Sequence, residues 1–260
     1  MKPYFDEDGI TLYHGDCRDV LPTIAPASVD LIVTDPPYGV AWQSGARNLP
    51  FSEMANDNGD FDVHAVLMHA LNLLREGRHI YCFGLEDWRS LPIPVAVELI
   101  WDKGMAGLGQ LDLPWGLQHE KILFGVLVQS KQNRERGSGQ LSARLRRGSV
   151  LRVPRKNSQA VNRHPTEKPV ELLRQLIESS SMLGETVLDP FSGSGSTLVA
   201  ARIEGRRALG IEIDERYCEV TARRLAQASL FPAASPEMPR NGALEPAGAL
   251  FGAPPGSEDF

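Results

Sequence analysis

Apolar residues along this chain of 260 residues follow two periods, one typical of strands and one typical of helices. Short apolar runs bounded by Gly, Pro or Asp predict buried strands, and longer stretches with apolar positions three and four residues apart predict amphipathic helices. Because most strands precede a helix, the sequence predicts an α/β fold with a doubly wound, mostly parallel sheet. The predicted strands are 12–16, 29–34, 79–83, 94–101, 120–128, 186–188 and 207–213, and the predicted helices are 20–24, 63–74, 171–182, 196–204 and 216–228.

Four stretches lack such a period. Residues 39–62 are polar and rich in Asn, Gly and Asp, which at this length predicts a functional loop such as a lid, or disorder. Residues 102–118 are predicted to form a loop, and residues 129–163 an excursion from the sheet. Residues 231–260 hold six Pro, four Gly and six Ala, so we expect a disordered or loosely attached tail.

Charge is distributed unevenly along the chain. The net charge of −6 would by itself argue against a nucleic-acid partner. Residues 129–163, however, contain ten Lys or Arg and a single acid, Glu135, so this segment carries +9 and the rest of the chain −15. Such a separation predicts a surface for a polyanion such as nucleic acid.

The remaining composition is that of an ordinary globular protein. No stretch approaches the roughly 18 apolar residues of a membrane span, and the N-terminus lacks an apolar signal region, so we expect a cytoplasmic protein without a membrane partner. Cys17, Cys82 and Cys218 lie far apart without paired spacing. This pattern predicts neither a disulfide framework nor a metal site.

A glycine-rich turn, Asp189-Pro-Phe-Ser-Gly-Ser-Gly-Ser196, joins a predicted strand to a predicted helix. Gly193 and Gly195 allow positive φ and close approach to a ligand, and the helix that follows points free N–H groups at the same place. An ordinary tight turn is the alternative. A triphosphate-binding loop would need a lysine after Gly195, and a dinucleotide fingerprint would need glycine in place of Leu198, so both of these interpretations lose support.

Three carboxylates at predicted strand ends indicate the kind of ligand. Asp189 begins the turn, Asp16 follows another strand, and Glu212 lies nineteen residues after Gly193, where a carboxylate can accept both hydroxyls of a ribose. Carboxylates repel a diphosphate but suit an adenosine that carries positive charge. S-adenosylmethionine, with its sulfonium and ammonium groups, is such a ligand, although Glu212 alone could be a solvated acid.

A second candidate site is Asp35-Pro-Pro-Tyr38, directly after the buried strand 29–34. Two prolines cannot donate ladder hydrogen bonds, so the strand must end there with a stiff backbone. The exocyclic amino group of a base is a poor nucleophile because its lone pair is delocalised into the ring. The Asp35 carboxylate and a rigid carbonyl could accept both amino hydrogens and free the lone pair for attack on a methyl group, while Tyr38 stacks on a flipped base. A structural turn is the alternative.

These two motifs, together with His164-Pro-Thr-Glu-Lys-Pro169, resemble the amino-methyltransferases of DNA. The resemblance covers roughly residues 10–228, and the order of the motifs resembles the β group, in which a target-recognition region separates a catalytic from a cofactor-binding half. It implies a Rossmann-like S-adenosylmethionine-dependent methyltransferase fold in permuted order. The implied parts are a catalytic half at 1–128, a basic target-recognition insert at 129–163, a cofactor-binding half at 164–230 and the tail at 231–260. Shorter segments fit as well, namely Leu12-Tyr-His-Gly-Asp-Cys17, Trp101-Asp-Lys103 and Gly210-Ile-Glu-Ile-Asp214.

The resemblance also implies a role for each matching residue. Asp35 would bind the target amino group beside the cofactor, Pro36 would supply the carbonyl next to Pro37, and Tyr38 would stack on the base. The implied cofactor contacts are Asp189, Phe191, Gly193 and Gly195 for the methionine end, Thr166, Lys168 and Ser196 for its carboxylate, Glu212 for the ribose, and Asp16 and Cys17 for the adenine. The implied DNA contacts are Arg134, Arg136, Arg144, Arg146, Arg147, Arg152, Arg155 and Lys156. Lys168 could instead be a surface lysine, and Trp101 could belong to the core or to a pocket wall.

The expected function is site-specific methyl transfer from S-adenosylmethionine to N6 of adenine in double-stranded DNA by base flipping. N4-cytosine methylation is the main alternative, but such enzymes more often carry Ser where Asp35 stands. Glutamine methylation goes with Asn there and would leave the basic insert unexplained. An inactive DNA-binding module and a nicotinamide oxidoreductase are alternatives from other classes. The insert is short for the family, so a homodimer would enlarge the DNA footprint of a monomer, and a cognate restriction endonuclease is a candidate partner.

Overall fold

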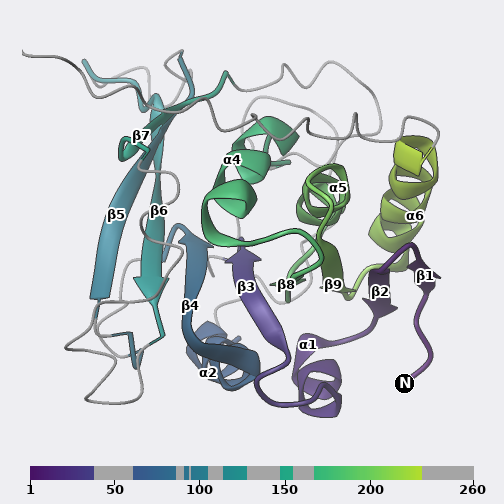
Figure 1. Cartoon of the computed structure of the whole chain (residues 1–260). Coiled ribbons are helices and arrows are strands. Elements are labelled where there is room, and N and C mark those ends of the chain that lie inside the picture. Colours follow the sequence, from purple (N-terminus) through teal and green to yellow (C-terminus); the bar gives the residue numbers. More distant parts are fainter. Residues whose placement is uncertain are drawn as a thin grey trace, which may run out of the picture.

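The structure, a computed structural model, describes residues 1–37, 61–85, 91–93, 95–104, 114–127, 147–154 and 167–229. Within these residues a nine-stranded sheet is covered by helices on both faces (Figure 1). The strands are β1 (Phe5–Glu7), β2 (Ile10–His14), β3 (Val29–Thr34), β4 (Leu74–Phe83), β5 (Val95–Asp102), β6 (His119–Val126), β7 (Val150–Arg152), β8 (Thr186–Asp189) and β9 (Arg207–Glu212). The helices are α1 (Cys17–Val20), a 3-10 turn η1 (Leu21–Thr23), α2 (Val63–Leu73), α4 (Val170–Ser180), α5 (Ser196–Ile203) and α6 (Glu215–Ser229).

Strand β3 lies in the middle of the sheet, and all six of its residues are buried. Because side chains alternate along a strand, Leu31 and Val33 join the core beneath α4, α5 and α6, whereas Ile32 joins the core beneath α1 and α2. A strand covered on both faces must be apolar throughout, which explains its continuous hydrophobic run. Figure 1 shows the same two layers of helices.

The sheet order is β1-β2-β9-β8-β3-β4-β6-β5-β7, and five of the eight strand pairings among the described residues are parallel. The prediction of a doubly wound, mostly parallel sheet is therefore confirmed. The antiparallel pairings are β1 with β2, β4 with β6, and β5 with β6. Because β6 runs against β4, its first residues lie at the edge where β4 ends.

Several local predictions were wrong. The two edge strands β1 and β7 were not predicted, because each has only three residues and no apolar run. Strand β7 also shows that residues 129–163 are not wholly an excursion, since Val150 pairs with Ile100 of β5. The helix predicted at 20–24 begins instead at Cys17, where the Asp16 carboxylate caps it, and the helix predicted at 171–182 is α4, which begins at Val170 with Pro169 as its N-cap. Residues 39–60 of the predicted loop and the predicted tail lie outside the described residues.

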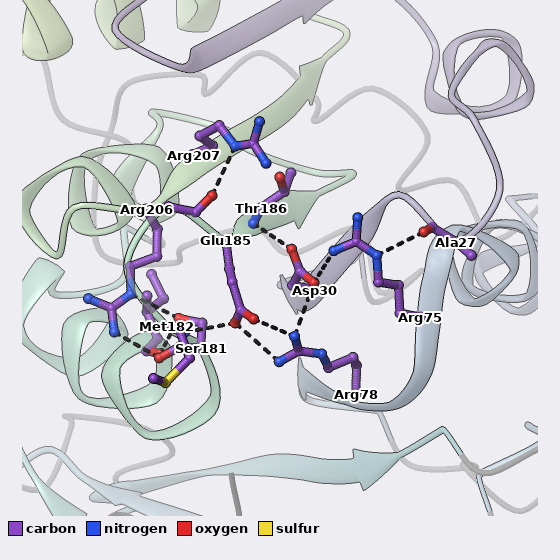
Figure 2. A network of polar contacts seen from close by, with 12 residues as sticks. Ala27, Asp30, Arg75, Arg78, Ser181, Met182, Glu185, Thr186, Arg206 and Arg207 are labelled. Atoms are coloured by element: carbon purple, nitrogen blue, oxygen red, sulfur yellow. Dashed lines mark hydrogen bonds and ion pairs between the residues drawn. The ribbon is translucent and has the colours of Figure 1, made fainter. Parts of the chain in front are cut away.

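A cluster of charged side chains links neighbouring strands at the start of β3 (Figure 2). Asp30 is only 1% exposed and accepts hydrogen bonds from Arg75 and from the backbone N–H of Thr186, 2.9 Å away. Arg78 lies 3.3 Å from Asp30 and also pairs with Glu185. The cluster thus joins β3, β4 and the start of β8 at the edge where the parallel strands begin.

Two features of other protein classes are absent from the described residues. None of the helices found there has both the length and the apolar character that a membrane crossing requires. The same residues contain no group of three or more His, Cys, Asp or Glu side chains that could hold a metal ion. Cys17, Cys82 and Cys218 are buried free thiols.

Candidate active site

The predicted strand-end residues meet at one edge of the sheet, because β3, β8 and β9 are parallel neighbours. A pocket opens at the ends of β3 and β8, in the position where ligands bind to open α/β sheets. The structure therefore brings the two motifs of the sequence, which are far apart along the chain, to one place. Predicted site residues in the pocket lining are Asp35, Lys168, Asp189, Gly193 and Ser196, and Glu167, Thr34 and Phe83 also line it.

The glycine turn has the backbone that its sequence predicts. Gly193 and Gly195 have φ of 49° and 77°, and the N–H of Gly195 donates to Ser192 O at 2.7 Å. A Cβ on Gly195 would lie 2.3 Å from the Thr221 side chain, so this position requires glycine for space as well as for conformation. A Cβ on Gly193 would meet nothing within 4 Å. The turn thus presents open backbone to the pocket just before α5 begins.

Asp189 is the most perturbed acid of the pocket. It is 4% exposed, and burial raises the pKa of its carboxyl to about 7. Hydrogen bonds from the Thr197 hydroxyl and the Phe191 N–H act in the opposite direction and lower this pKa. The nearby charge of Asp35 raises this pKa further. A cationic ligand in the pocket would relieve both effects. The side chains present therefore fit a positively charged ligand.

Glu212 binds backbone rather than open space. Its two carboxylate oxygens accept the N–H groups of Gly193 and Asp214, each at 2.8 Å, and it does not line the pocket. Burial raises the pKa of Glu212, while these two N–H donors oppose the shift. The structure therefore shows Glu212 holding the glycine turn against the end of β9. A ribose contact of this carboxylate stays a prediction.

Asp16 and Cys17 lie beside the end of β9, where the N–H of Gly15 donates to Glu212 O at 2.9 Å. Asp16 accepts the backbone N–H of Arg18 and pairs with its guanidinium. Burial raises the pKa of Cys17 to about 12, so its thiol is neutral at physiological pH. These residues form a fixed corner near the glycine turn, and their contact with the adenine stays a prediction.

An aromatic contact that the sequence did not indicate lies next to this corner. The rings of Phe191 and Phe61 meet edge to face, with their centroids 5.8 Å apart. The Arg18 guanidinium lies 5.1 Å from the centre of the Phe61 ring. Phe191 is thereby fixed by a residue of the long segment after Asp35. No motif marks Phe61, and only its place in the fold reveals this contact.

Asp35 is engaged by Lys168, whose Nζ lies 2.7 Å from Asp35 Oδ2. Lys168 is 9% exposed, so the alternative of a surface lysine is wrong. Its Nζ also lies 2.8 Å from Glu120 Oε1, and Glu120 pairs with Lys103 at 3.0 Å. Glu120 was missed in the sequence because nothing in a strand pattern marks its long-range partners. Trp101 belongs to the core, where its indole N–H donates to Val153 O at 2.8 Å.

Some predicted site residues lie outside the described part of the chain. These include the stacking residue Tyr38 and the cofactor residue Thr166. Of the predicted DNA contacts, Arg152 is described and its side chain is 82% exposed, whereas Arg147 pairs with Glu178 of α4. The DNA contacts stay predictions. The predicted residues outside the described ranges are Tyr38, Thr166, Arg134, Arg136, Arg144, Arg146, Arg155 and Lys156.

A family model described as DNA methylase matches residues 96–223. YubD of Escherichia coli (strain K12), named as a methylase, is 30% identical over 220 residues, which cover 82% of this chain and 88% of YubD. The DNA adenine methyltransferase YhdJ of the same organism is 28% identical, over 88% of this chain and 87% of YhdJ. The type II methyltransferase M2.DpnII of Streptococcus pneumoniae is 27% identical, over 86% of this chain and 92% of the relative.

Solved structures share the fold. TTHA0409 of Thermus thermophilus, crystallised with S-adenosyl-L-methionine, superposes with a TM-score of 0.56 at 24% identity, over 84% of this chain and 95% of the other. The cytosine-N4-specific PvuII DNA methyltransferase superposes with a TM-score of 0.62 at 14% identity, over 86% of this chain and 88% of the other. At these identities the likeness shows the Rossmann-like fold alone.

Proposed function

The chain belongs to the N6/N4 family of DNA methyltransferases, and from this premise we propose that it methylates N6 of adenine in double-stranded DNA with S-adenosylmethionine as methyl donor. The observation that carries the proposal is the joint placement of Asp35 and Asp189 in one pocket. One motif suits the amino group of a base, and the other suits a cationic adenosine compound. The two motifs are far apart in sequence, but the parallel pairing of β3 with β8 brings them together in space.

The cofactor-binding half of the pocket is supported by the chemistry of its side chains. Asp189 would face the charged methionine end, and the open backbone at Gly193 together with the start of α5 at Ser196 would accept polar groups of the ligand. Glu212 keeps this backbone in place. Bound in this way, S-adenosylmethionine supplies an electrophilic methyl group on its sulfonium.

The chain's own part in the reaction falls to Asp35 and the proline that follows it. The Asp35 carboxylate and the Pro36 carbonyl would accept the two amino hydrogens, so that the nitrogen lone pair leaves the ring and points at the methyl group. As the bond between the amino nitrogen and the methyl carbon forms, the bond between that carbon and the sulfonium sulfur would break and leave the neutral thioether S-adenosylhomocysteine. The amino nitrogen would then release one proton to solvent. The base reaches this position only after it has left the stack of the DNA helix. Tyr38 would then stack on the flipped base.

DNA would approach the edge that carries the pocket. Strand β7, which belongs to the basic segment, ends at that edge, since Arg152 pairs in register with Asp102, the last residue of β5. The charge of +9 in residues 129–163 supports phosphate contacts whose strength falls with salt. A homodimer and a cognate endonuclease stay predictions that rest on the resemblance.

Adenine is favoured over cytosine by Asp35 itself, because N4-cytosine enzymes more often carry Ser there. The relative YhdJ is named an adenine enzyme, which agrees with this choice. Methylation of cytosine N4 is the second candidate, because the PvuII enzyme with the same fold is cytosine-N4-specific.

The test uses purified protein, S-adenosylmethionine labelled in the methyl group, and genomic DNA from a host without methyltransferases, followed by digestion to nucleosides. The proposal expects label in N6-methyladenine. Label in N4-methylcytosine alone would support the second candidate, and unlabelled DNA would contradict both. Titration calorimetry with S-adenosylmethionine and with NAD separates this function from an oxidoreductase.

A further inference from the structure

Four side chains of alternating charge form a continuous row beside the pocket. Lys103 Nζ lies 3.0 Å from Glu120 Oε2, and Lys168 Nζ lies 2.8 Å from Glu120 Oε1 and 2.7 Å from Asp35 Oδ2. The row ends on the carboxylate that we propose binds the target amino group. Glu120 and Lys103 extend the site beyond the residues with a role in the proposed reaction.

Each member of the row is fixed by regular structure. Asp35 directly follows β3, Glu120 belongs to β6, Lys103 directly follows β5, and Lys168 lies two residues before α4. The Lys168 ammonium also lies 4.9 Å from the centre of the Phe83 ring, so an aromatic face packs against it. Lys168 pairs with two carboxylates, those of Asp35 and Glu120, so the position of its ammonium depends on both.

We propose that Glu120 is a positioning residue for methyl transfer: it shares the Lys168 ammonium with Asp35 and thereby sets the place of the Asp35 carboxylate. Without Glu120 the whole charge of Lys168 would fall on Asp35. The ion pair would then tighten and pull Asp35 toward Lys168, away from the amino group that it must accept. This inference rests on the proposed function and adds to it a residue of β6.

Several charged side chains of the described residues lie around Lys168. Asp35 and Glu120 contact it directly, and Asp189 lies in the same pocket lining. The neighbouring Glu167 is held by Arg224 of α6, at 2.9 Å. Among the described residues, Lys103 also acts on Lys168, through Glu120.

These surroundings keep Lys168 and Glu120 charged. Burial lowers the pKa of Lys168, but Asp35 and Glu120 outweigh it, so the pKa lies above its ordinary value. Burial raises the pKa of Glu120, but Lys168 and Lys103 outweigh it in the same manner, so this pKa lies below its ordinary value. Loss of the Glu120 charge should therefore lower the pKa of Lys168, because burial then acts against a single carboxylate.

The test compares the wild type with Glu120→Gln, which keeps the size of the side chain and removes its charge. We expect kcat for DNA methylation to fall by roughly tenfold to a hundredfold, as for a displaced catalytic group. KM for S-adenosylmethionine and the Kd for DNA should stay within about threefold, because neither ligand is assigned to Glu120. The alkaline limb of the pH–rate profile should move toward neutral pH.

Matched variants separate this role from a general loss of charge. Glu98→Gln removes an acid from the same strand pair, where Glu98 and Lys121 form an exposed ion pair at 3.1 Å, and should keep wild-type kcat. Lys103→Gln leaves the pairs of Lys168 intact and should have a smaller effect than Glu120→Gln. Acylation of Lys168, read by mass spectrometry against pH, should begin at lower pH in Glu120→Gln and needs no activity.

The outcomes separate this inference from the function that it rests on. A wild type that methylates no DNA would overturn both together. An active wild type whose Glu120→Gln variant keeps its kcat and its alkaline limb, with unchanged labelling of Lys168, would overturn the inference alone. A Glu120→Gln variant in which only KM for S-adenosylmethionine rises would also overturn it. Lys168 would then bind the cofactor carboxylate and would not position Asp35.

Discussion

Strand β3 carries a carboxylate at each end, and the two are treated differently. Asp30, at the first end, is 1% exposed and is bound by Arg75, Arg78 and the N–H of Thr186 (Figure 2). Asp35, at the other end, lines a pocket and pairs with Lys168. The donors around the first group come from two strands, β4 and β8, whereas the second group faces a cavity that a ligand can enter. One strand therefore separates an end that stabilises the sheet from an end that is open to chemistry.

The same contrast extends to the neighbours of both residues. At the first end, Glu185 accepts the N–H of Met182 at 2.7 Å and pairs with Arg78, so that the acids meet cations and backbone donors. At the other end, Asp189 is buried with its pKa raised to about 7. A raised pKa of a buried acid costs folding free energy, and such costs are concentrated at functional sites.

The largest effect on activity is expected from the substitution Asp35→Ala. We predict a loss of methyl transfer of about a thousandfold or more, because the amino group loses its acceptor. Binding of S-adenosylmethionine and DNA should persist, as measured by calorimetry and by fluorescence anisotropy. A variant that keeps its transfer rate would show that the chemistry does not take place at this end of β3.

The opposite result is expected from Asp30→Ala. The free energy of unfolding should fall by about 2–4 kcal/mol, because the N–H of Thr186 and two arginines lose a common buried partner. Urea denaturation measures this loss. At a temperature where the variant is folded, kcat should match that of the wild type, and a selective loss of kcat would contradict the assignment of Asp30 to stability.

Glycines at the two edges provide a matched pair. Gly184, near the Asp30 cluster, and Gly195, in the glycine turn, have φ of 76° and 77°, but an added Cβ would clash with Thr221 only at Gly195. Gly184→Ala should cost about 1 kcal/mol of stability and leave cofactor affinity unchanged. Gly195→Ala should cost about 2–3 kcal/mol and weaken binding of S-adenosylmethionine. Equal effects of the two substitutions on binding would contradict the role of the turn.

The last prediction concerns the pH dependence of stability. The pKa of Asp189 is about 7 in the folded protein against an ordinary value of 3.8, so between these values the folded state binds more protons than the unfolded chain. Its contribution to the free energy of unfolding therefore falls as pH rises through this window. Asp189→Asn should remove that fall, as measured by denaturation at a series of pH values. Identical slopes for the two proteins would contradict the raised pKa.

The sequence predicted the parts of this fold that depend on local pattern. Strand β3 was predicted with its observed bounds, and the start of α5 at Ser196 follows from the glycine turn. Strand β7 was missed, because three residues in a polar segment carry no period and its pairing with β5 is long-range. Motifs located Asp35 and Asp189, since their neighbours in sequence define the backbone.

Contacts between distant residues could not be predicted in this way. The position of Asp30 within a hydrophobic run did not reveal its partners, because Arg75, Arg78 and Thr186 come from other elements. Glu120 is separated from Lys168 by the whole basic segment, and no pattern of apolar positions links them. Charge pairing of this kind depends on the assembled sheet, so it emerged only from the structure.

The central claim is that methyl transfer takes place on adenine at the Asp35 end of β3. Its most direct test is to express the wild type and Asp35→Ala in a host without methyltransferases and to sequence the host DNA by a method that reads modified bases. The claim predicts N6-methyladenine at a defined sequence in the DNA exposed to the wild type, and none with the variant. Modified adenine with both proteins, or modified cytosine alone, would contradict it.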